Sequence, residues 1–176
     1  MIKKTALAII FIFNLSALLY LISPAPTLPD LPNSIKSDEP GDTVQIPNVS
    51  AYYTNLSRTE IINFYKANYN DFFRIQLNHP PEKAKNIIRD TIQSYYLEEF
   101  VLPYKETLYI NGFEWEKDVF TKPEKRIKNK LLYHGKEYSA KVTIRTFPVS
   151  IPKCLISFYF TETIVIIALL IYAKKI

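Results

Sequence analysis

The sequence predicts an α+β domain, in which two helices pack on an antiparallel sheet, with one transmembrane helix at each terminus of the chain. Three observations favour this fold class. Long apolar runs stand at both ends of the 176 residues. Between them, apolar residues recur first at the helical period and later in the alternation of strands, with turn signals in between. These changes divide the chain into a first membrane helix at 1–23, a linker at 24–47, a folded domain at 48–149 and a second membrane helix at 150–176.

The N-terminal apolar run spans residues 5–23 and carries no charge over nineteen residues. About twenty helical residues, each rising roughly 1.5 Å, cross the hydrocarbon layer of a bilayer. A cleaved signal peptide is the competing interpretation, because Lys3 and Lys4 precede the run. The run is longer than the apolar part of most signal peptides, and Pro24 and Pro26 fit poorly next to a cleavage site. We therefore expect an uncleaved anchor.

The C-terminal apolar run, residues 154–173, contains Glu162 near its middle. A central carboxylate costs roughly 2.5–3.5 kcal/mol on insertion scales, whereas each Leu, Ile, Phe or Val contributes about 0.3–0.6 kcal/mol in favour of insertion. Eleven such residues lie between Leu155 and Ile171, so the sum still favours insertion. A buried strand or core helix of the domain is the alternative, but two prolines separate the run from the strand before it. A membrane helix is the better interpretation.

Four lysines at the chain ends account for most of the net charge of +5. Lys3 and Lys4 precede the first apolar run, and Lys174 and Lys175 follow the second. Basic residues in these positions are typical of the cytoplasmic ends of membrane helices. We therefore expect both termini in the cytoplasm and the middle domain on the opposite side of the membrane. The expected partner is the lipid bilayer, with other envelope proteins as further partners, and not nucleic acid.

Residues 24–47 contain six of the twelve prolines and four acidic side chains. Such a composition buries too little apolar surface to fold by itself, and proline favours an extended chain. This linker is therefore expected to be a semi-stiff tether between the first membrane helix and the domain.

The domain is expected to open with a short strand, "NVSAYYT", followed by a helix. Ser57 and Glu60 have the spacing of a capping box, which marks a helix start. A second helix is predicted after Pro81, because apolar residues from Ala84 to Tyr95 recur at the helical period.

Strands are predicted in the remainder of the domain. Asn111–Gly112 is the stronger hairpin signal and His134–Gly135 the weaker one. From Tyr138 to Arg145 apolar and polar residues alternate, as in a half-buried strand. The strands are expected to form an antiparallel meander with one face covered by the helices.

The sequence contains no recognisable catalytic or cofactor-binding motif. The single cysteine rules out an intramolecular disulfide and, with only two isolated histidines, argues against a metal site. We therefore expect no catalytic residue, no metal and no cofactor. Carboxylates in the strand region have no fixed separation and are expected to face water rather than form an acid–base pair: Glu98, Glu99, Glu106, Glu114 and Glu116.

Two groups of polar residues remain as candidate contact sites. Asn14 and Glu162 lie at the centres of the two membrane helices, so we expect a hydrogen bond that closes the helices into a hairpin. A proton-carrying or partner-binding Glu162 is the alternative. The second group is basic and is expected in a solvated loop, or in contact with anionic lipid headgroups or an acidic wall polymer: Lys122, Lys125, Arg126, Lys128 and Lys130.

The segment "YYTNLSRTEIINFYKANY" and the layout around it resemble uncharacterised bacterial membrane-anchored proteins, which carry a small exported α+β domain between two terminal membrane helices. The resemblance implies a location in the cell envelope, and it carries over no assigned activity or mechanism. We expect a non-enzymatic interaction or scaffolding component of the envelope. The alternative is a binding module for an anionic or sugar-containing wall polymer or a small ligand, in which exposed aromatic rings contact the sugar; an enzyme comes third.

Overall fold

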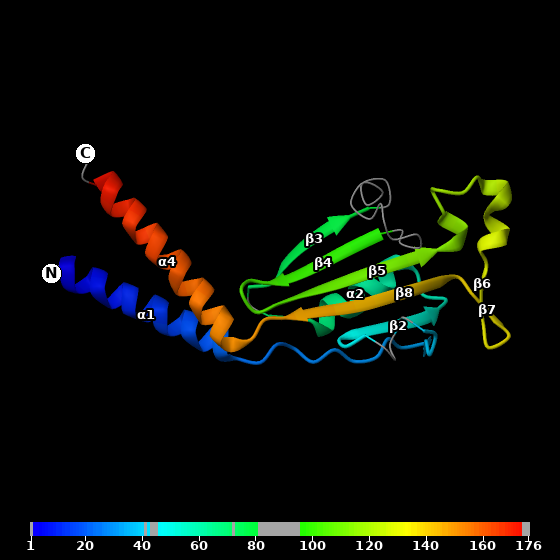
Figure 1. The fold of residues 1–176 in the computed structure, drawn as a ribbon, viewed down its shortest axis with the longest axis horizontal. Coiled ribbons are helices and arrows are strands. Elements are labelled where there is room, and N and C mark those ends of the chain that lie inside the picture. The colour runs from blue at the N-terminus through cyan, green and yellow to red at the C-terminus, as the bar shows by residue number, and fades with distance from the viewer. Residues whose placement is uncertain (1, 41, 43–45, 72, 81–95, 174–176) are drawn as a thin grey trace. The chain divides into compact units, whose positions relative to one another are not determined.

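The computed structural model describes residues 2–40, 42, 46–71, 73–80 and 96–173 (Figure 1). The chain forms two compact units, of which one comprises Met1–Ala25 with Pro148–Ile176 and the other Pro26–Phe147. The helix predicted after Pro81 and the lysines at 174 and 175 lie outside the described residues.

The first unit consists of two long helices, α1 (Ile2–Ile22) and α4 (Ile151–Ala173). Most of their described apolar side chains are exposed, although a helix that is apolar on all sides normally lies in a protein core or a membrane. In the described part of the chain, α4 is the one helix long and apolar enough to cross a membrane. The apolar stretch of α1 is shorter, Ala8–Ile22, so one candidate span is found where the sequence predicts two.

The second unit is built on a six-stranded antiparallel sheet with the strand order β1–β2–β8–β5–β4–β3 (Figure 1). The α+β class predicted from the sequence is confirmed by this arrangement. A separate two-stranded ribbon is formed by β6 and β7. The strands are β1 (Ser34–Lys36), β2 (Val49–Thr54), β3 (Ile75–His79), β4 (Tyr96–Leu102), β5 (Glu106–Glu114), β6 (Leu131–Tyr133), β7 (Lys136–Tyr138) and β8 (Ala140–Pro148).

The helix α2 (Arg58–Asn68) covers one face of the sheet (Figure 1). It starts at the predicted capping box, which is confirmed: the Ser57 side chain accepts a hydrogen bond from the Glu60 backbone, and the Glu60 carboxylate accepts one from Ser57 N at 2.8 Å. An ion pair of 2.6 Å between Arg58 and the fully buried Glu98 ties the start of α2 to β4. The core contains these buried side chains of α2 and the central strands: Ile61, Tyr65, Phe100, Leu102, Leu108, Ile110, Val142 and Ile144.

The predicted hairpin turn at Asn111–Gly112 is wrong, because both residues lie inside β5 and pair with β4. The chain turns instead after Leu102, where Lys105 N donates to Leu102 O at 3.0 Å and Tyr104 has a φ of 64°. Pro103 suits the second position of a turn, but the left-handed position after it normally selects glycine or asparagine. A tyrosine at that position gives no turn signal in the sequence.

The hairpin predicted at His134–Gly135 is confirmed, since these residues join β6 and β7 with φ values of 49° and 74°. Positive φ at both central residues is typical of a type I′ turn, and glycine adopts it without strain. The alternation predicted from Tyr138 to Arg145 is also confirmed, because Ala140, Val142 and Ile144 are buried and the residues between them are not.

Residues 26–40, here called the leader, differ from the extended tether that their composition predicts. Within the leader, β1 pairs with β2, and Leu31 and Ser37 are buried. Glu39 accepts hydrogen bonds from Tyr53 Oη at 2.7 Å and from Lys141 Nζ at 2.8 Å. The leader is therefore held to the sheet by polar partners and by one added strand, which the local composition could not reveal.

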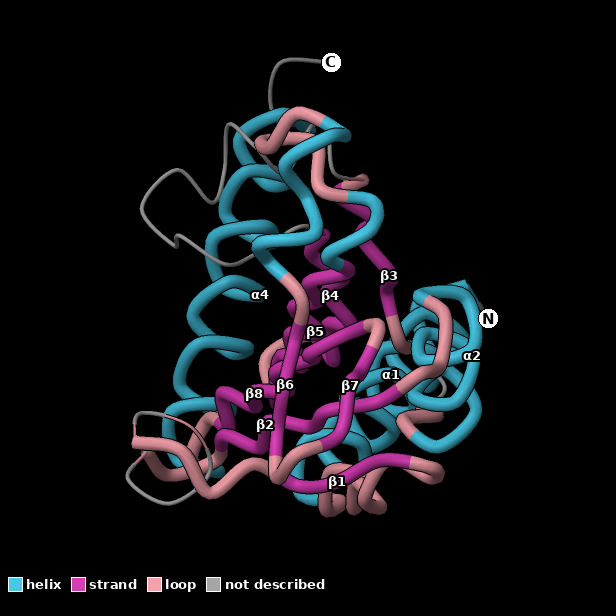
Figure 2. Tube along the Cα trace, turned by 90° about the vertical axis from the view of Figure 1, so that its right-hand side faces the viewer, coloured by secondary structure: helices cyan, strands magenta, loops and turns pink. Residues whose placement is uncertain are grey.

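Two short 3₁₀ helices, η1 (Trp115–Lys117) and η2 (Pro123–Asn129), follow β5. Together with the β6–β7 ribbon they stand at the end of the sheet where β5 ends and β8 begins (Figures 1 and 2). The opposite end of β8 leads to the end of this unit at Phe147.

Candidate functional site

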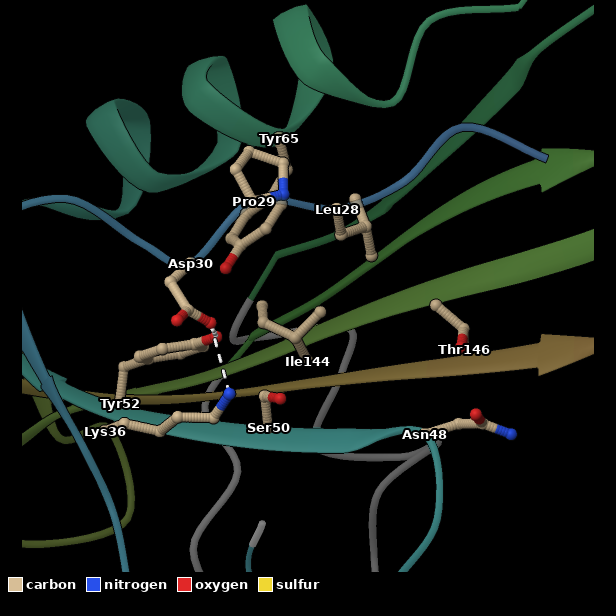
Figure 3. A pocket seen from close by; sticks show the side chains of 10 residues that line it. All are labelled: Leu28, Pro29, Asp30, Lys36, Asn48, Ser50, Tyr52, Tyr65, Ile144 and Thr146. Carbon is tan, nitrogen blue, oxygen red and sulfur yellow. Dashed lines mark hydrogen bonds and ion pairs between the residues drawn. The ribbon is translucent and has the colours of Figure 1, made fainter.

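A polar pocket of about 220 Å³ lies between the leader, α2 and the sheet (Figure 3). This volume is somewhat below the roughly 300–1,000 Å³ of most small-molecule pockets. It is lined by Leu28, Pro29, Asp30 and Lys36 of the leader, by Tyr65 of α2, and by Asn48, Ser50, Tyr52, Ile144 and Thr146 at β2 and β8.

The floor of the pocket follows from the pleat of two neighbouring strands. Ser50 and Tyr52 are two residues apart in β2, and Ile144 and Thr146 are two residues apart in β8, so each pair points to one face of the sheet. The register pairs Ser50 with Ile144, so the pocket-lining side chains of β2 and β8 lie side by side. Figure 3 shows the leader crossing above these side chains, with Tyr65 projecting from α2.

Asp30 is the one carboxylate among the residues that line the pocket. It accepts a hydrogen bond from Tyr52 Oη at 2.6 Å and one from Lys36 Nζ at 3.1 Å. The Tyr52 hydrogen bond, followed by that of Lys36, lowers the pKa of the Asp30 carboxyl below its usual value. Asp30 is therefore ionised at neutral pH, and its side chain is largely exposed, so it can accept further hydrogen bonds.

Tyr65 contributes a buried hydroxyl that has no hydrogen-bond partner among the described residues. Its side chain is only 1 % exposed. Burial raises the pKa of this hydroxyl, with smaller contributions from Tyr52 and Asp30, so the group is a neutral donor and acceptor. Buried polar groups without a partner are rare in native proteins, because the lost hydration costs about 1–3 kcal/mol. A water or a ligand in the pocket would satisfy the Tyr65 hydroxyl.

The pocket offers several hydroxyl groups, one amide, one ammonium and one carboxylate, and no pair of carboxylates. Such groups hold a polar molecule by hydrogen bonds. Among the described residues, no three His, Cys, Asp or Glu side chains gather in the way that a metal ion requires.

The strand carboxylates named above lie apart from the pocket, and most have partners of their own. Glu98 pairs with Arg58, and Glu114 Oε2 lies 2.6 Å from Lys117 Nζ. Glu106 accepts a hydrogen bond from Tyr69 Oη at 2.9 Å, although burial still raises the pKa of its carboxyl. These contacts tie α2, β4, β5 and η1 together.

The predicted intramembrane pair is brought together within the helical unit. Asn14 Nδ2 donates to Glu162 Oε1 at 2.9 Å, and also to Ile10 O at 3.1 Å in its own helix. The rings of Phe13 and Phe158 lie 6.3 Å apart beside this contact. Both polar side chains are half-buried between helices whose other side chains are mostly exposed.

The five predicted basic residues do not gather at the pocket and fall into two sets. Arg126 and Lys130 are engaged within the domain: Arg126 donates to the backbone oxygens of Thr121 and Glu116, and Lys130 Nζ lies 2.9 Å from Glu137 Oε2. Lys122, Lys125 and Lys128 are exposed on and beside η2.

No known protein family, no curated protein and no solved structure matches this chain. The pocket residues were missed by the sequence analysis, because Asp30 and Lys36 lie in a segment whose composition predicts a tether. The available signal was the alternation in "NVSAYYT", which places Ser50 and Tyr52 on one face of a strand.

Proposed function

We propose that the protein is a membrane-anchored binding protein whose domain holds a small, hydroxyl-rich ligand in the polar pocket. The observation that carries the proposal is the buried Tyr65 hydroxyl, which faces the pocket and lacks a partner among the described residues. A ligand hydroxyl can accept from Tyr65 while another donates to Asp30, because each hydroxyl is both donor and acceptor. The size of the pocket favours a monosaccharide, either free or as the end unit of a wall polymer.

The experiment compares Tyr65→Phe with Tyr69→Phe in the full-length protein. Tyr69 is the matched control, because it is also a buried tyrosine of the same region but does not line the pocket. The proteins are placed in lipid nanodiscs, so that no detergent with a sugar headgroup is present during the measurement. Saturation-transfer NMR is then recorded with glucose, with N-acetylglucosamine and with glycerol as a small polyol.

At least one of the two sugars is expected to bind the wild-type protein. Tyr65→Phe should weaken this binding about 2- to 10-fold, the equivalent of one net hydrogen bond. Tyr69→Phe should leave it unchanged. Absence of saturation transfer with all three probes, or equal binding by the Tyr65→Phe variant, would contradict the proposal.

The anchor is proposed to consist of two membrane helices, with both termini cytoplasmic and the domain outside. The full length of α1, 21 residues, corresponds to about 31 Å at 1.5 Å per residue, close to the hydrocarbon thickness. The hydrogen bond between Asn14 and Glu162 supports helices that pair inside a bilayer, where such bonds contribute about 0.6–2 kcal/mol.

A cysteine pair tests this anchor. Asn14→Cys and Glu162→Cys, in a Cys154→Ser background, should form a disulfide within one chain when the membranes are oxidised. Asn14→Cys with Ile171→Cys is the control, because position 171 lies more than two helical turns from 162. If neither pair, or only the control pair, cross-links, the two-helix anchor is wrong.

A protein partner is the second candidate function, and the edge strand β3 favours it. Phe73, Ile75 and Leu77 are between 44 and 52 % exposed, and β3 ends the strand order in the described sheet. Exposed apolar edge strands are common sites of strand addition by a partner. Ile75→Lys with Leu77→Lys should release any subunit that co-purifies with the full-length protein from mild detergent; retention of that subunit would argue against this surface.

A further inference from the structure

The segment 118–132, here called the basic tip, combines exposed apolar side chains with an excess of positive charge. It carries five basic and two acidic residues. Four large apolar side chains in it are between 42 and 64 % exposed: Val119, Phe120, Ile127 and Leu132. Exposed apolar groups that gather beside polar or charged residues are a feature of protein and membrane interaction sites.

The basic tip is held in shape by its own polar residues. Asp118 is 3 % exposed and accepts hydrogen bonds from the backbone of Phe120 at 2.7 Å and of Thr121 at 3.0 Å. Its other oxygen accepts from Asn129 Nδ2 at 2.8 Å, and Arg126 Nε donates to Thr121 O at 3.2 Å. The exposed apolar side chains therefore lie on a loop whose conformation is stabilised by internal hydrogen bonds.

The side chains of η2 fall on three faces, of which one contacts the rest of the basic tip and two are exposed to solvent. In a 3₁₀ helix, residues three apart lie on the same face. Arg126 and Asn129 form the face that bonds to the rest of the tip, as their contacts show. Lys125 and Lys128 share a second face and Ile127 lies on the third, and all three are exposed. The outer surface of η2 thus presents lysines beside an apolar side chain.

We propose that the basic tip inserts into the headgroup region of an anionic lipid bilayer. Lysines near an anionic surface and apolar side chains that reach the acyl boundary together give stable peripheral binding, whereas either alone gives weak binding. A purely hydrophilic polyanion would be attracted by the lysines but would gain nothing from Phe120 and Ile127. The exposed apolar groups therefore select the bilayer over a wall polymer.

The test measures binding of the full-length protein to vesicles added from outside. The protein is first placed in nanodiscs of phosphatidylcholine, so that the lipid around its helices is neutral. Co-sedimentation is then measured with vesicles of phosphatidylcholine alone and with vesicles that also contain phosphatidylglycerol. The wild-type protein should sediment with the anionic vesicles and not with the neutral ones.

Two double variants separate charge from apolar insertion. Lys125→Gln with Lys128→Gln should weaken binding to the anionic vesicles about 30-fold, at roughly fivefold per lysine. Phe120→Ser with Ile127→Ser should weaken it about tenfold or more, because the apolar contact is lost. Lys66→Gln with Lys136→Gln removes two exposed charges outside the tip and should change binding much less.

Three outcomes would overturn the proposal. Equal sedimentation with neutral and anionic vesicles would remove the role of charge. A loss of binding in the lysine variant without any loss in the Phe120 and Ile127 variant would make the tip a surface for polyanions in general. Equal weakening by the control variant would show a nonspecific effect of net charge.

Discussion

At the scale of single residues, three tyrosines show how one side-chain type serves different purposes in this domain. Tyr52 and Tyr53 donate to Asp30 and Glu39 of the leader. Burial, helped by the hydrogen bond to Glu39, raises the pKa of Tyr53 to about 12, so its hydroxyl remains a donor at neutral pH. Tyr65 is similarly buried, but its hydroxyl has no hydrogen-bond partner among the described residues.

The stability of the ligand-free protein should respond in opposite ways to loss of two tyrosine hydroxyls. Tyr69→Phe leaves the half-buried Glu106 carboxyl without its donor, and should lower the free energy of unfolding by about 1–3 kcal/mol. Tyr65→Phe removes a hydroxyl that has no acceptor and should be neutral or stabilising. Thermal unfolding followed by circular dichroism measures both. An equal loss in the two variants would mean that Tyr65 already has a strong partner.

At the scale of elements, the leader is the part whose attachment depends most on charge. The hydrogen bonds from Lys141 and then Tyr53 lower the pKa of the Glu39 carboxyl. The hydrogen bonds from Tyr52 and then Lys36 likewise lower the pKa of the Asp30 carboxyl. A carboxyl whose pKa is lower in the folded state stabilises that state above its unfolded pKa. That stabilisation is lost as the pH falls through the pKa that the carboxyl has in the folded state.

The leader should therefore loosen on acidification before the sheet unfolds. The expected change begins as the pH falls below about 4, near the ordinary pKa of free carboxyls, and is complete at lower pH. Hydrogen exchange of the backbone amides in 30–39 should rise at pH 3 relative to pH 6, after correction for intrinsic rates, while β4 and β5 stay protected. Simultaneous loss of protection in the leader and in these strands would contradict the prediction.

At the scale of the whole molecule, two compact units of different character share one chain. The helical unit exposes apolar side chains on most sides, whereas the sheet unit has an apolar core and polar attachments. The proposed function uses this division, since the proposed anchor and the proposed ligand pocket are built from separate residues.

The proposed topology predicts where the sheet unit is accessible. Lys66→Cys, at an exposed position of α2, should react with a membrane-impermeant maleimide in intact cells when Cys154 is replaced by serine. A cysteine in place of Lys3 should react only after the membrane is permeabilised. Labelling of the Lys3 position alone in intact cells would reverse the orientation.

Local patterns determined much of the secondary structure, because their physical causes act over a few residues. The capping box at Ser57, the turn at His134–Gly135 and the alternation of β8 all depend on neighbours at most a few residues away. The turn at Tyr104 could not be predicted in this way, since the tertiary pairing of β4 with β5 imposes a conformation that tyrosine rarely adopts.

The sequence by itself determined the apolar ends, the α+β class and the expected hydrogen bond between Asn14 and Glu162. These features follow from composition and from the period of the apolar residues, which can be read along the chain. Only the tertiary structure decided that the leader folds onto the sheet and that a pocket forms beneath it. Asp30 meets Tyr52 across 22 residues and Glu39 meets Lys141 across 102. Contacts between such distant side chains depend on how strands are paired, and no local pattern in one sequence records that pairing.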